Sequence, residues 1–543
     1  MAVCLDQRQL PGVSRLYADY LYAFDRVARF YAVAESPFAP AAFAAAASRV
    51  AYATAVRSRM AEVLERQNRG WGASAATEAL LAQFRRPETV AVVAGQQVGL
   101  LGGPVLTVYK AMTAVLAAER MRSEGIAAVP VFWMATQDHD FAEVNHAWVL
   151  GSNGEPQRIE WAAPDAATAA PVGRIGLGPA IAGVLEAFAQ AAGAAPEAMA
   201  PLQAAYRPGE TLGSAFARLL AAWFAPWGLI LLDPLDPTLA PLSAPLLAEV
   251  VARPDALSAA LRQRSEELTA AGYHAQVHDS GAALLFLETA GQRQPLRFTE
   301  GAAHAGQQRF SPAELAALLR AQPERFSPGA LLRPLVQDLL LPTAVQVTGP
   351  AETAYLAQSS ALYAALGRYQ PLRLPRLSAT LVDARARRLL ERFQLTVLDI
   401  WRLDPQGDGE AALAAWLARR ALPGDLAAGL AAQRENAAQG LAGLAAQVGE
   451  VDPTLVDFVR TVGDKVRHQF DQIEAKLARS LARRQEDLGR QARHLAGLLY
   501  PGRHLQERRW NSAAAALRLG PAWPALLHDQ LQAACPDHQL LDF

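Results

Sequence analysis

Short apolar runs alternate with helical patterns through much of the chain, and each run ends in glycine or in polar residues. Continuous apolar runs of this length are typical of strands buried on both faces of a parallel sheet. Strands that alternate with helices predict an α/β fold, here with a Rossmann-like parallel-sheet core. The apolar runs cover 90–94, 129–135, 228–234 and 344–348, and the main helical patterns beside them cover about 105–121 and 351–366.

The pattern also predicts how the rest of the chain is organised around this core. Two stretches interrupt the alternation. One is rich in alanine and proline, and the other contains alternating segments at 273–310 that predict a small antiparallel β unit. Both are interpreted as insertions. The predicted parts are N-terminal helices at 1–89 packed on the core, a core at 90–405 with insertions at about 151–205 and 255–326, a helical domain at 410–500, and a C-terminal segment at 501–543 that returns to the core.

The stretch 410–500 has the apolar spacing of an antiparallel helical hairpin. Gly449 and the pair Asp452-Pro453 break it into two arms. The second arm carries a coiled-coil-like stripe, whereas the first is alanine-rich and too thin to cover it, so we expect a homodimer through the coiled coil. The alternative is that the hairpin docks on the core of its own chain. The first arm is marked by Leu426, Leu430, Leu441, Leu444 and Val448, and the stripe comprises Phe458, Val462, Val466, Phe470, Ile473, Leu477 and Leu481.

Composition and charge narrow the class of protein. The 543 residues carry a formal net charge of -1, which gives no overall attraction to nucleic acid, and no long uncharged apolar window predicts a membrane span. Cys4 and Cys535 are the two cysteines. Two cysteines exclude a disulfide framework and favour a reducing cytoplasm, and we expect neither to act as a nucleophile.

Polar residues gather directly after the predicted strands, where open α/β sheets bind their ligands. Several of these residues have a structural role as an alternative. The glycines can form a tight turn, the aspartate can cap a helix, and the glutamate can interact favourably with a helix dipole. The candidates outside 138–146 are Gly95, Gln96, Gln97, Lys110, Asp233, Arg333, Gly349, Glu352 and Tyr355.

The segment 138–146 is the densest cluster of candidate chemistry. If it is helical, His139, Glu143 and His146 fall within about 60° of one another on one face. Together with Asp138, Asp140 and Asn145 that face predicts a polar substrate or nucleotide site. A metal site is the alternative, ranked lower because the HExxH pattern is absent, and no residue is assigned to a metal. A solvated face is the third interpretation.

Several separate blocks of the sequence together carry a family resemblance. The first blocks are GQQVGLLGGPVLTVYKA at 95–111 and VPVFWMATQDHDFAEVNH at 129–146. Later blocks lie at 326–334, 341–352 and 505–511. These blocks resemble the BshC family, the cysteine ligases of bacillithiol synthesis, and the similarity spans nearly the whole chain in the expected order. The resemblance implies an enzyme that joins the carboxyl group of L-cysteine to the amine of glucosaminyl malate.

Amide formation in water needs an activated carboxyl group, so ATP or another nucleotide is suspected as the co-substrate. The chain contains neither GxGxxG nor GxxxxGK[ST], the two standard glycine motifs that bind phosphate groups. It also lacks the HIGH and KMSKS signatures of class I aminoacyl-tRNA synthetases, so no motif predicts nucleotide binding. Lys110 and Arg333 are the candidate cations, and His139 is the candidate general base, oriented by Asp140 or Glu143. Hydroxyl groups are expected to bind to Gln96, Gln97, Asp138 and Asn145.

Two other functions fit the same residues. One is a metal-dependent hydrolase of a related sugar conjugate that uses His139, Glu143 and His146. The other is a non-enzymatic dimeric scaffold that binds a nucleotide or a sugar. Stoichiometric metal in the purified protein would favour the hydrolase, and ATP-dependent amide formation would favour the ligase. Ligand binding without turnover would favour the scaffold.

Overall fold

The structure, a computed structural model, describes residues 3–31, 35–162, 170–275, 283–289, 292–299, 301–402, 409–420, 422, 424–484 and 486–543. The chain divides into two compact units. Unit 1 comprises Met1–Val149, Gln157–Thr380 and Glu507–Leu541, and unit 2 comprises Leu150–Pro156, Leu381–Gln506 and Asp542–Phe543. Among the described residues, none of the helices combines the length and the apolar character that crossing a bilayer requires.

The centre of unit 1 is a five-stranded sheet in which every pairing is parallel, in the order β13-β12-β2-β3-β6. From β2 the chain moves outward through β3 to β6, and it then returns to the other side of β2 through β12 to β13. The direction therefore reverses between β2 and β12, which is the topological switch point of a Rossmann-like sheet. The predicted fold class is confirmed. The strands are β2 (Val90–Gln96), β3 (Ala128–Met134), β6 (Ile230–Leu232), β12 (Thr343–Thr348) and β13 (Leu372–Pro375).

Both faces of this sheet are covered, which explains why its strands are apolar at nearly every position. Every residue of β3 and β12 is buried. Alternate side chains such as Val131 pack in one hydrophobic cluster with α3 (Thr54–Trp71) and α4 (Ala75–Phe84). On the opposite face Phe132 meets Phe216 of α9 (Leu212–Trp223), and α5 (Leu106–Ser123) packs against β2 and β3.

The glycine-rich loop between β2 and α5 is a tight turn packed on itself. Gly102 and Gly103 have positive φ angles of 86° and 68°. A Cβ atom on Gly102 would lie 2.8 Å from the ring of Trp223, and one on Gly99 would lie 2.6 Å from the Cα atom of Gly103. Glycine is therefore required here for backbone conformation and close packing.

A second sheet of unit 1 is antiparallel throughout, in the order β10-β9-β8-β7-β11. It confirms the antiparallel unit predicted at 273–310. The predicted segment 274–278 lies largely outside the described residues, and β11 extends the sheet beyond the predicted range. The strands are β7 (Leu285–Thr289), β8 (Gln292–Thr299), β9 (Ala302–Ala305), β10 (Gln308–Phe310) and β11 (Phe326–Pro328).

The helix predicted for 138–146 is wrong. Helix α6 covers only Phe141–Val144, and His146 is the first residue of strand β4 (His146–Leu150). The Asp140 carboxylate caps the short helix by accepting a hydrogen bond from the Glu143 amide at 3.1 Å. Because the chain becomes extended at His146, no helical face presents His139, Glu143 and His146 together.

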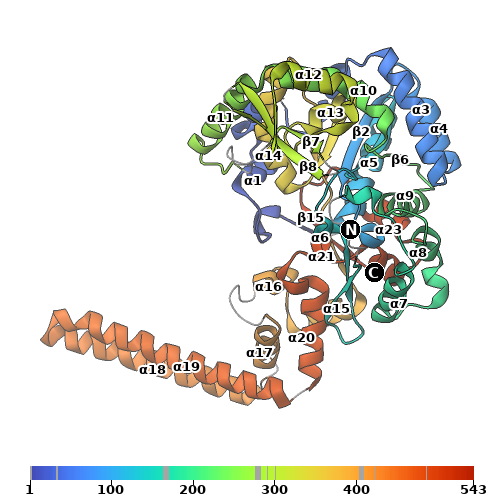
Figure 1. The fold of residues 1–543 in the computed structure, drawn as a ribbon. Coiled ribbons are helices and arrows are strands. Elements are labelled where there is room, and N and C mark those ends of the chain that lie inside the picture. Colours follow the sequence, from blue (N-terminus) through green and yellow to red (C-terminus); the bar gives the residue numbers. More distant parts are fainter. Residues whose placement is uncertain are drawn as a thin grey trace. The chain divides into compact units, whose positions relative to one another are not determined.

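In unit 2, α18 (Gly424–Val451) and α19 (Val456–Arg484) lie side by side as the predicted hairpin (Figure 1). Asp452 begins the turn between them and accepts a hydrogen bond from the Thr454 amide, as the Asp452-Pro453 pair predicts. The apolar stripe of α19 is only partly covered. Phe458 and Ile473 are 66% and 51% exposed. The half-buried members of the stripe are Val462, Val466, Phe470 and Leu477. The side chain of Leu481 lies outside the described residues.

Candidate functional site

A cavity of about 500 Å³ lies at the carboxyl ends of the parallel strands in unit 1. Its walls include the residues that follow β2, β3, β12 and β13, so it occupies the switch point, where α/β sheets of this kind bind ligands. The charged residues that line it are Lys110, Asp138, Glu143, Arg293, Arg333, Glu352, Arg376 and Arg508, and the predicted residues Gly95, Gln96, Gln97, Gly349 and Tyr355 also line it.

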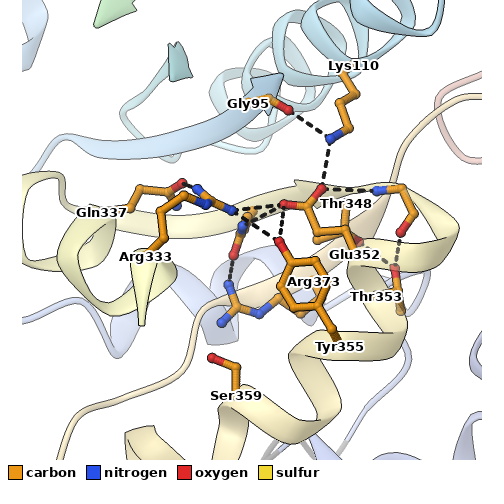
Figure 2. Close-up of polar contacts among 12 residues, drawn as sticks. Gly95, Lys110, Arg333, Gln337, Thr348, Glu352, Thr353, Tyr355, Ser359 and Arg373 are labelled. Carbon is orange, nitrogen blue, oxygen red and sulfur yellow. Dashed lines mark hydrogen bonds and ion pairs between the residues drawn. The ribbon is translucent and has the colours of Figure 1, made fainter. Parts of the chain in front are cut away.

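Glu352 is the centre of a buried hydrogen-bond network at this cavity (Figure 2). It lies in the first turn of α14 (Pro350–Ala365), and its Oε2 atom is 2.8 Å from the Nζ atom of Lys110, which also donates to the Gly95 carbonyl at 2.8 Å. Its Oε1 atom is 3.1 Å from Nη2 of Arg333 and 3.5 Å from the Tyr355 hydroxyl. Glu352 therefore positions both predicted cations.

The charges in this network are strongly coupled. Burial opposes ionisation of Glu352, but Lys110 and Arg333 outweigh it and lower the pKa of the carboxyl group. Burial also lowers the pKa of Lys110, and the Glu352 charge opposes that shift. Because the two groups are 2.8 Å apart, we describe them as an ionised pair.

A second layer behind Glu352 was missed by sequence reasoning. Gln346 of β12 donates from Nε2 to Glu352 Oε1 at 3.3 Å, and its own Oε1 accepts from the buried guanidinium of Arg373. Thr348 and Thr353 are hydrogen-bonded at 2.8 Å beside them (Figure 2). Polar residues within the otherwise apolar strands β12 and β13 were the signal that could have revealed this layer.

Arg376 and Arg508 form a second cationic part of the cavity wall, and neither was predicted. Arg376 follows β13, and its Nη1 atom lies 3.0 Å from Oε2 of Glu507, with both side chains only 2% exposed. The Ser378 hydroxyl and the Ala379 amide donate to the same Glu507 oxygen. Arg508 is the next residue after Glu507 and lies within the block 505–511 that had already been singled out.

Arg508 differs from the other cations because no partner holds its guanidinium among the described residues. Burial first, and then the positive charge of Arg376, lowers the pKa of Arg508. A Cβ atom placed on Gly349 would lie 3.7 Å from Arg376 and 3.8 Å from Lys110. Both distances are ordinary van der Waals contacts, so the backbone at Gly349 lies directly beside the side chains of Arg376 and Lys110 at the cavity wall.

The other part of the cavity wall is acidic. The amide of Gln97 donates from Nε2 to Asp138 Oδ2 at 2.6 Å and to Glu143 Oε2 at 2.7 Å. Both carboxylates line the cavity, and the Asp138 side chain is further held by the His139 amide at 2.8 Å. Asp138 and Glu143 follow β3, whereas Arg376 follows β13, so the charge changes sign along the strand order.

His139 and Asp140 do not line this cavity. Burial, followed by the Arg293 charge, lowers the pKa of His139, and its Nδ1 atom has no hydrogen-bond partner in the described part of the chain. The carboxylate of Asp140 caps α6, and no hydrogen bond joins it to His139 among the described residues. The acids that the structure brings to the cavity from the segment 138–146 are Asp138 and Glu143.

Asn145, His146 and Asp233 also lie away from the cavity lining. Asn145 donates to Glu160 and to the Trp161 carbonyl. His146 Nδ1 is 3.1 Å from the Ala142 carbonyl. Asp233 accepts from the Thr136 hydroxyl and, at 2.9 Å, from the Leu235 amide, so it holds the turn after β6.

The predicted metal-binding alternative has no matching geometry. Within the described residues, no group of three or more histidine, cysteine, aspartate or glutamate side chains is arranged to hold a metal ion. Glu143 is bonded to Gln97, and His146 belongs to a different element. The three proposed ligands are therefore not gathered at one point.

Comparison with known proteins covers the whole chain. Residues 3–377 match the model described as Bacillithiol biosynthesis BshC, N-terminal Rossmann-like domain, and residues 379–543 match the model of its C-terminal coiled-coil domain. Proteins named "Putative cysteine ligase BshC" are also similar to this chain over nearly their full length.

The protein of Solibacter usitatus is 36% identical over 540 residues, which cover 99% of each chain. The protein of Koribacter versatilis is 36% identical over 542 residues, which also cover 99% of each chain. The protein of Salinibacter ruber is 34% identical over 538 residues, covering 97% of this chain and 96% of its own. These matches over both units show that the chain belongs to the BshC family of bacillithiol biosynthesis.

Proposed function

We propose that this chain is a cysteine ligase that forms an amide bond between the carboxyl group of L-cysteine and the amine of glucosaminyl malate, giving bacillithiol. The observation that carries the proposal is the cavity at the switch point of a BshC-family sheet. Arg376, which follows β13, and Arg508 line one part of its wall, and the carboxylates of Asp138 and Glu143, which follow β3, line another. L-cysteine, glucosaminyl malate and a nucleotide all carry negative groups, and glucosaminyl malate also carries the amine that accepts cysteine. A cavity with a cationic part and an acidic part can therefore bind both kinds of group.

The cationic part of the wall is the proposed site for carboxylates or phosphates. Arg376 is held in place by Glu507. Arg508 has no side-chain partner among the described residues, so it can bind an anion without first losing an ion pair. Gly349 lines the same cavity and lies beside Arg376 and Lys110. The malyl carboxylates and the phosphates of a nucleotide both have the required charge.

The acidic part is the proposed site for the sugar hydroxyls and the acceptor amine. Asp138 and Glu143 can accept hydrogen bonds from both, and Gln97 fixes the two carboxylates relative to each other. A carboxylate beside the attacking amine can take its proton as the amide forms. Glu143 is therefore added to His139 as a candidate general base. His139 remains a candidate because its lowered pKa favours the neutral imidazole.

ATP is the proposed co-substrate. The cavity of about 500 Å³ has the size of small-molecule sites, and the Lys110, Arg376 and Arg508 cations fit phosphate groups by charge. When bound, the nucleotide would supply the phosphoryl or adenylyl group that activates the carboxyl group of L-cysteine. The protein's contribution is to hold the anions at one end and the amine at the other, so that the reacting groups meet in a fixed orientation.

We also propose that the protein is a homodimer through the coiled coil of unit 2, acting in a reducing cytoplasm. Exposed apolar side chains of the α18–α19 hairpin support the dimer, because soluble proteins seldom leave such a stripe open and a second copy of the same hairpin would cover it. These side chains are Leu426, Leu444, Val451, Leu455, Phe458 and Ile473.

Reconstitution with purified full-length protein tests the reaction. L-cysteine, glucosaminyl malate and ATP are incubated with the protein, and bacillithiol is measured by mass spectrometry. We expect product that requires all three small molecules. Formation without ATP would require another activating group, and binding of the substrates without any turnover would favour a scaffold role.

A further inference from the structure

Cys4 and Cys535 lie next to each other although they are separated by almost the whole chain. The Sγ atom of Cys535 donates to that of Cys4 at 3.4 Å. Both side chains are in the reduced thiol form, with Cys4 exposed and Cys535 half-buried. The positions of the two residues near opposite ends of the sequence gave no indication of this contact.

The backbone around both cysteines is fixed by contacts within unit 1. Cys4 lies in β1 (Val3–Leu5), which pairs antiparallel with β15 (His538–Asp542) so that Cys4 is opposite Gln539. On the other side, the Cys535 amide donates to the Gln532 carbonyl at 3.1 Å. The two sulfur atoms are therefore brought together by a strand pairing and a hydrogen-bonded turn.

Side chains from the N-terminal segment also hold the residues that follow Cys535. Gln7 donates from Nε2 to the Pro536 carbonyl at 2.6 Å, and the Tyr22 hydroxyl donates to Asp537 Oδ1 at 2.7 Å. The Tyr22 hydroxyl also accepts a hydrogen bond from the backbone N–H of Gln7 at 2.8 Å. A disulfide requires a sulfur separation of about 2.05 Å, so the two atoms need to approach by roughly 1.3 Å, which small side-chain rotations can supply.

The two thiols are unequal in reactivity. Burial raises the pKa of Cys535 to about 11, and the hydrogen bond to Cys4 and the charge of Asp537 act in the same direction. Cys535 therefore keeps its proton and donates it toward Cys4. Because a thiolate is the attacking species in disulfide exchange, the exposed Cys4 is suited to react first and Cys535 second.

We propose that Cys4 and Cys535 form a reversible disulfide by exchange with a small-molecule disulfide. The Cys4 thiolate attacks one sulfur of the small molecule, forms a mixed disulfide and releases one small thiol. Cys535 then loses its proton and attacks the Cys4 sulfur, which releases the second small thiol. Two protein thiols are oxidised, one small-molecule disulfide is reduced to two thiols, and the new bond joins β1 to the turn before β15.

The full-length protein tests this with cystine as the oxidant. After incubation and blocking of free thiols, trypsin should release residues 1–8 and 519–543 as one cross-linked species that dithiothreitol separates. Thiol titration of the folded protein should fall from two groups to none. The oxidised chain should also unfold at a higher temperature, because the bond encloses residues 4–535.

Two single variants separate the roles of the cysteines. Cys535→Ser should stop at the mixed disulfide and retain one half-cystine on Cys4. Cys4→Ser should react with cystine roughly tenfold or more slowly than Cys535→Ser, since its remaining thiol is half-buried and protonated. Wild-type protein that ends with a half-cystine on each cysteine, or that keeps both thiols while the denatured chain reacts, would overturn the proposal.

Discussion

The Lys110 ammonium lies 2.8 Å from the Glu352 carboxylate, and this contact joins helices that follow the two strands on either side of the switch point. Lys110 is in α5, which follows β2, and Glu352 is in α14, which follows β12. The same carboxylate also contacts Arg333 of α13 (Arg333–Leu340). Glu352 thus holds both Lys110 and Arg333, the two cations that the sequence predicted for anion binding.

Lys110→Met should weaken ATP binding at least tenfold, because it removes one of the cations beside Gly349. It should also lower the free energy of unfolding by about 2–4 kcal/mol, since it leaves the buried Glu352 with one cation fewer. Calorimetric titration and urea unfolding measure the two effects. Lys465→Met, at an exposed lysine of α19, is the matched control and should change neither. Unchanged affinity in Lys110→Met would assign Lys110 a purely structural role.

Arg508→Gln should reduce affinity for ATP or glucosaminyl malate about tenfold or more, with a change in unfolding free energy below about 1 kcal/mol. The reason is that Arg508 lines the cavity but is held by no partner among the described residues. Arg86→Gln, at an exposed arginine before β2, controls for loss of one positive charge. Equal affinities in the two variants would remove Arg508 from the proposed anion site.

Glu507→Gln should destabilise unit 1 by about 3–5 kcal/mol, because it leaves the buried guanidinium of Arg376 without its counter-charge. Burial opposes ionisation of Glu507, but Arg376 outweighs it and the pKa is lowered from its ordinary value of 4.5. The stabilisation is therefore complete above about pH 4.5 and is lost as the pH falls through the lower folded-state pKa.

Urea unfolding as a function of pH checks this sign. Wild-type protein should lose stability below pH 4.5 more steeply than Glu507→Gln, which lacks the titrating group. Glu450→Gln, at an exposed position of α18, should follow the wild-type curve. Parallel curves for wild type and Glu507→Gln would show that the pair contributes nothing to the acid dependence.

His139→Ala should abolish product formation if the imidazole is the general base, and the fold should persist because the residue is only half-buried. Its lowered pKa means that the base form is retained below pH 6.5, so the acid limb of the rate profile should lie below that value. His468→Ala on α19 is the control. Full activity of His139→Ala would leave Glu143 as the candidate base, which Glu143→Gln would then test.

Replacing two exposed side chains of the hairpin, Phe458→Glu with Ile473→Glu, should convert a dimer into a monomer without unfolding α19. Both side chains are largely exposed, so the hairpin itself should survive, as circular dichroism would report. Light scattering should give a mass near 58.1 kDa for the variant and about twice that for wild type. A wild-type mass of 58.1 kDa at micromolar concentration would contradict the dimer.

The parallel sheet and the helical hairpin could be predicted because their signals are local. Continuous apolar runs identified β2, β3, β6 and β12, and the Asp452-Pro453 pair marked the turn of the hairpin. The four-residue strand β13 was missed because Arg373 interrupts its apolar pattern. The helix predicted over 138–146 was wrong because spacing alone could not reveal the change to an extended chain at His146.

The candidate site was predicted in part, and the reason lies in sequence distance. Gln97, Asp138 and Glu352 come soon after strand ends, and Lys110 lies in the helix that follows β2, so their gathering at one sheet edge followed from the fold. The guanidinium groups of Arg376 and Arg508 come from segments whose place at the cavity depends on the buried contact between residues 376 and 507. The same limit hid the contact between Cys4 and Cys535, which depends on the pairing of the first and last strands.

Thiol analysis of a strain that lacks this gene tests the proposed ligase activity most directly. Bacillithiol and glucosaminyl malate are quantified in the deletion strain and after complementation with wild type or with Arg508→Gln. We predict loss of bacillithiol with accumulation of glucosaminyl malate, full restoration by wild type and reduced restoration by the variant. Normal bacillithiol in the deletion strain, with no accumulation of its cysteine-free precursor, would contradict the proposed function.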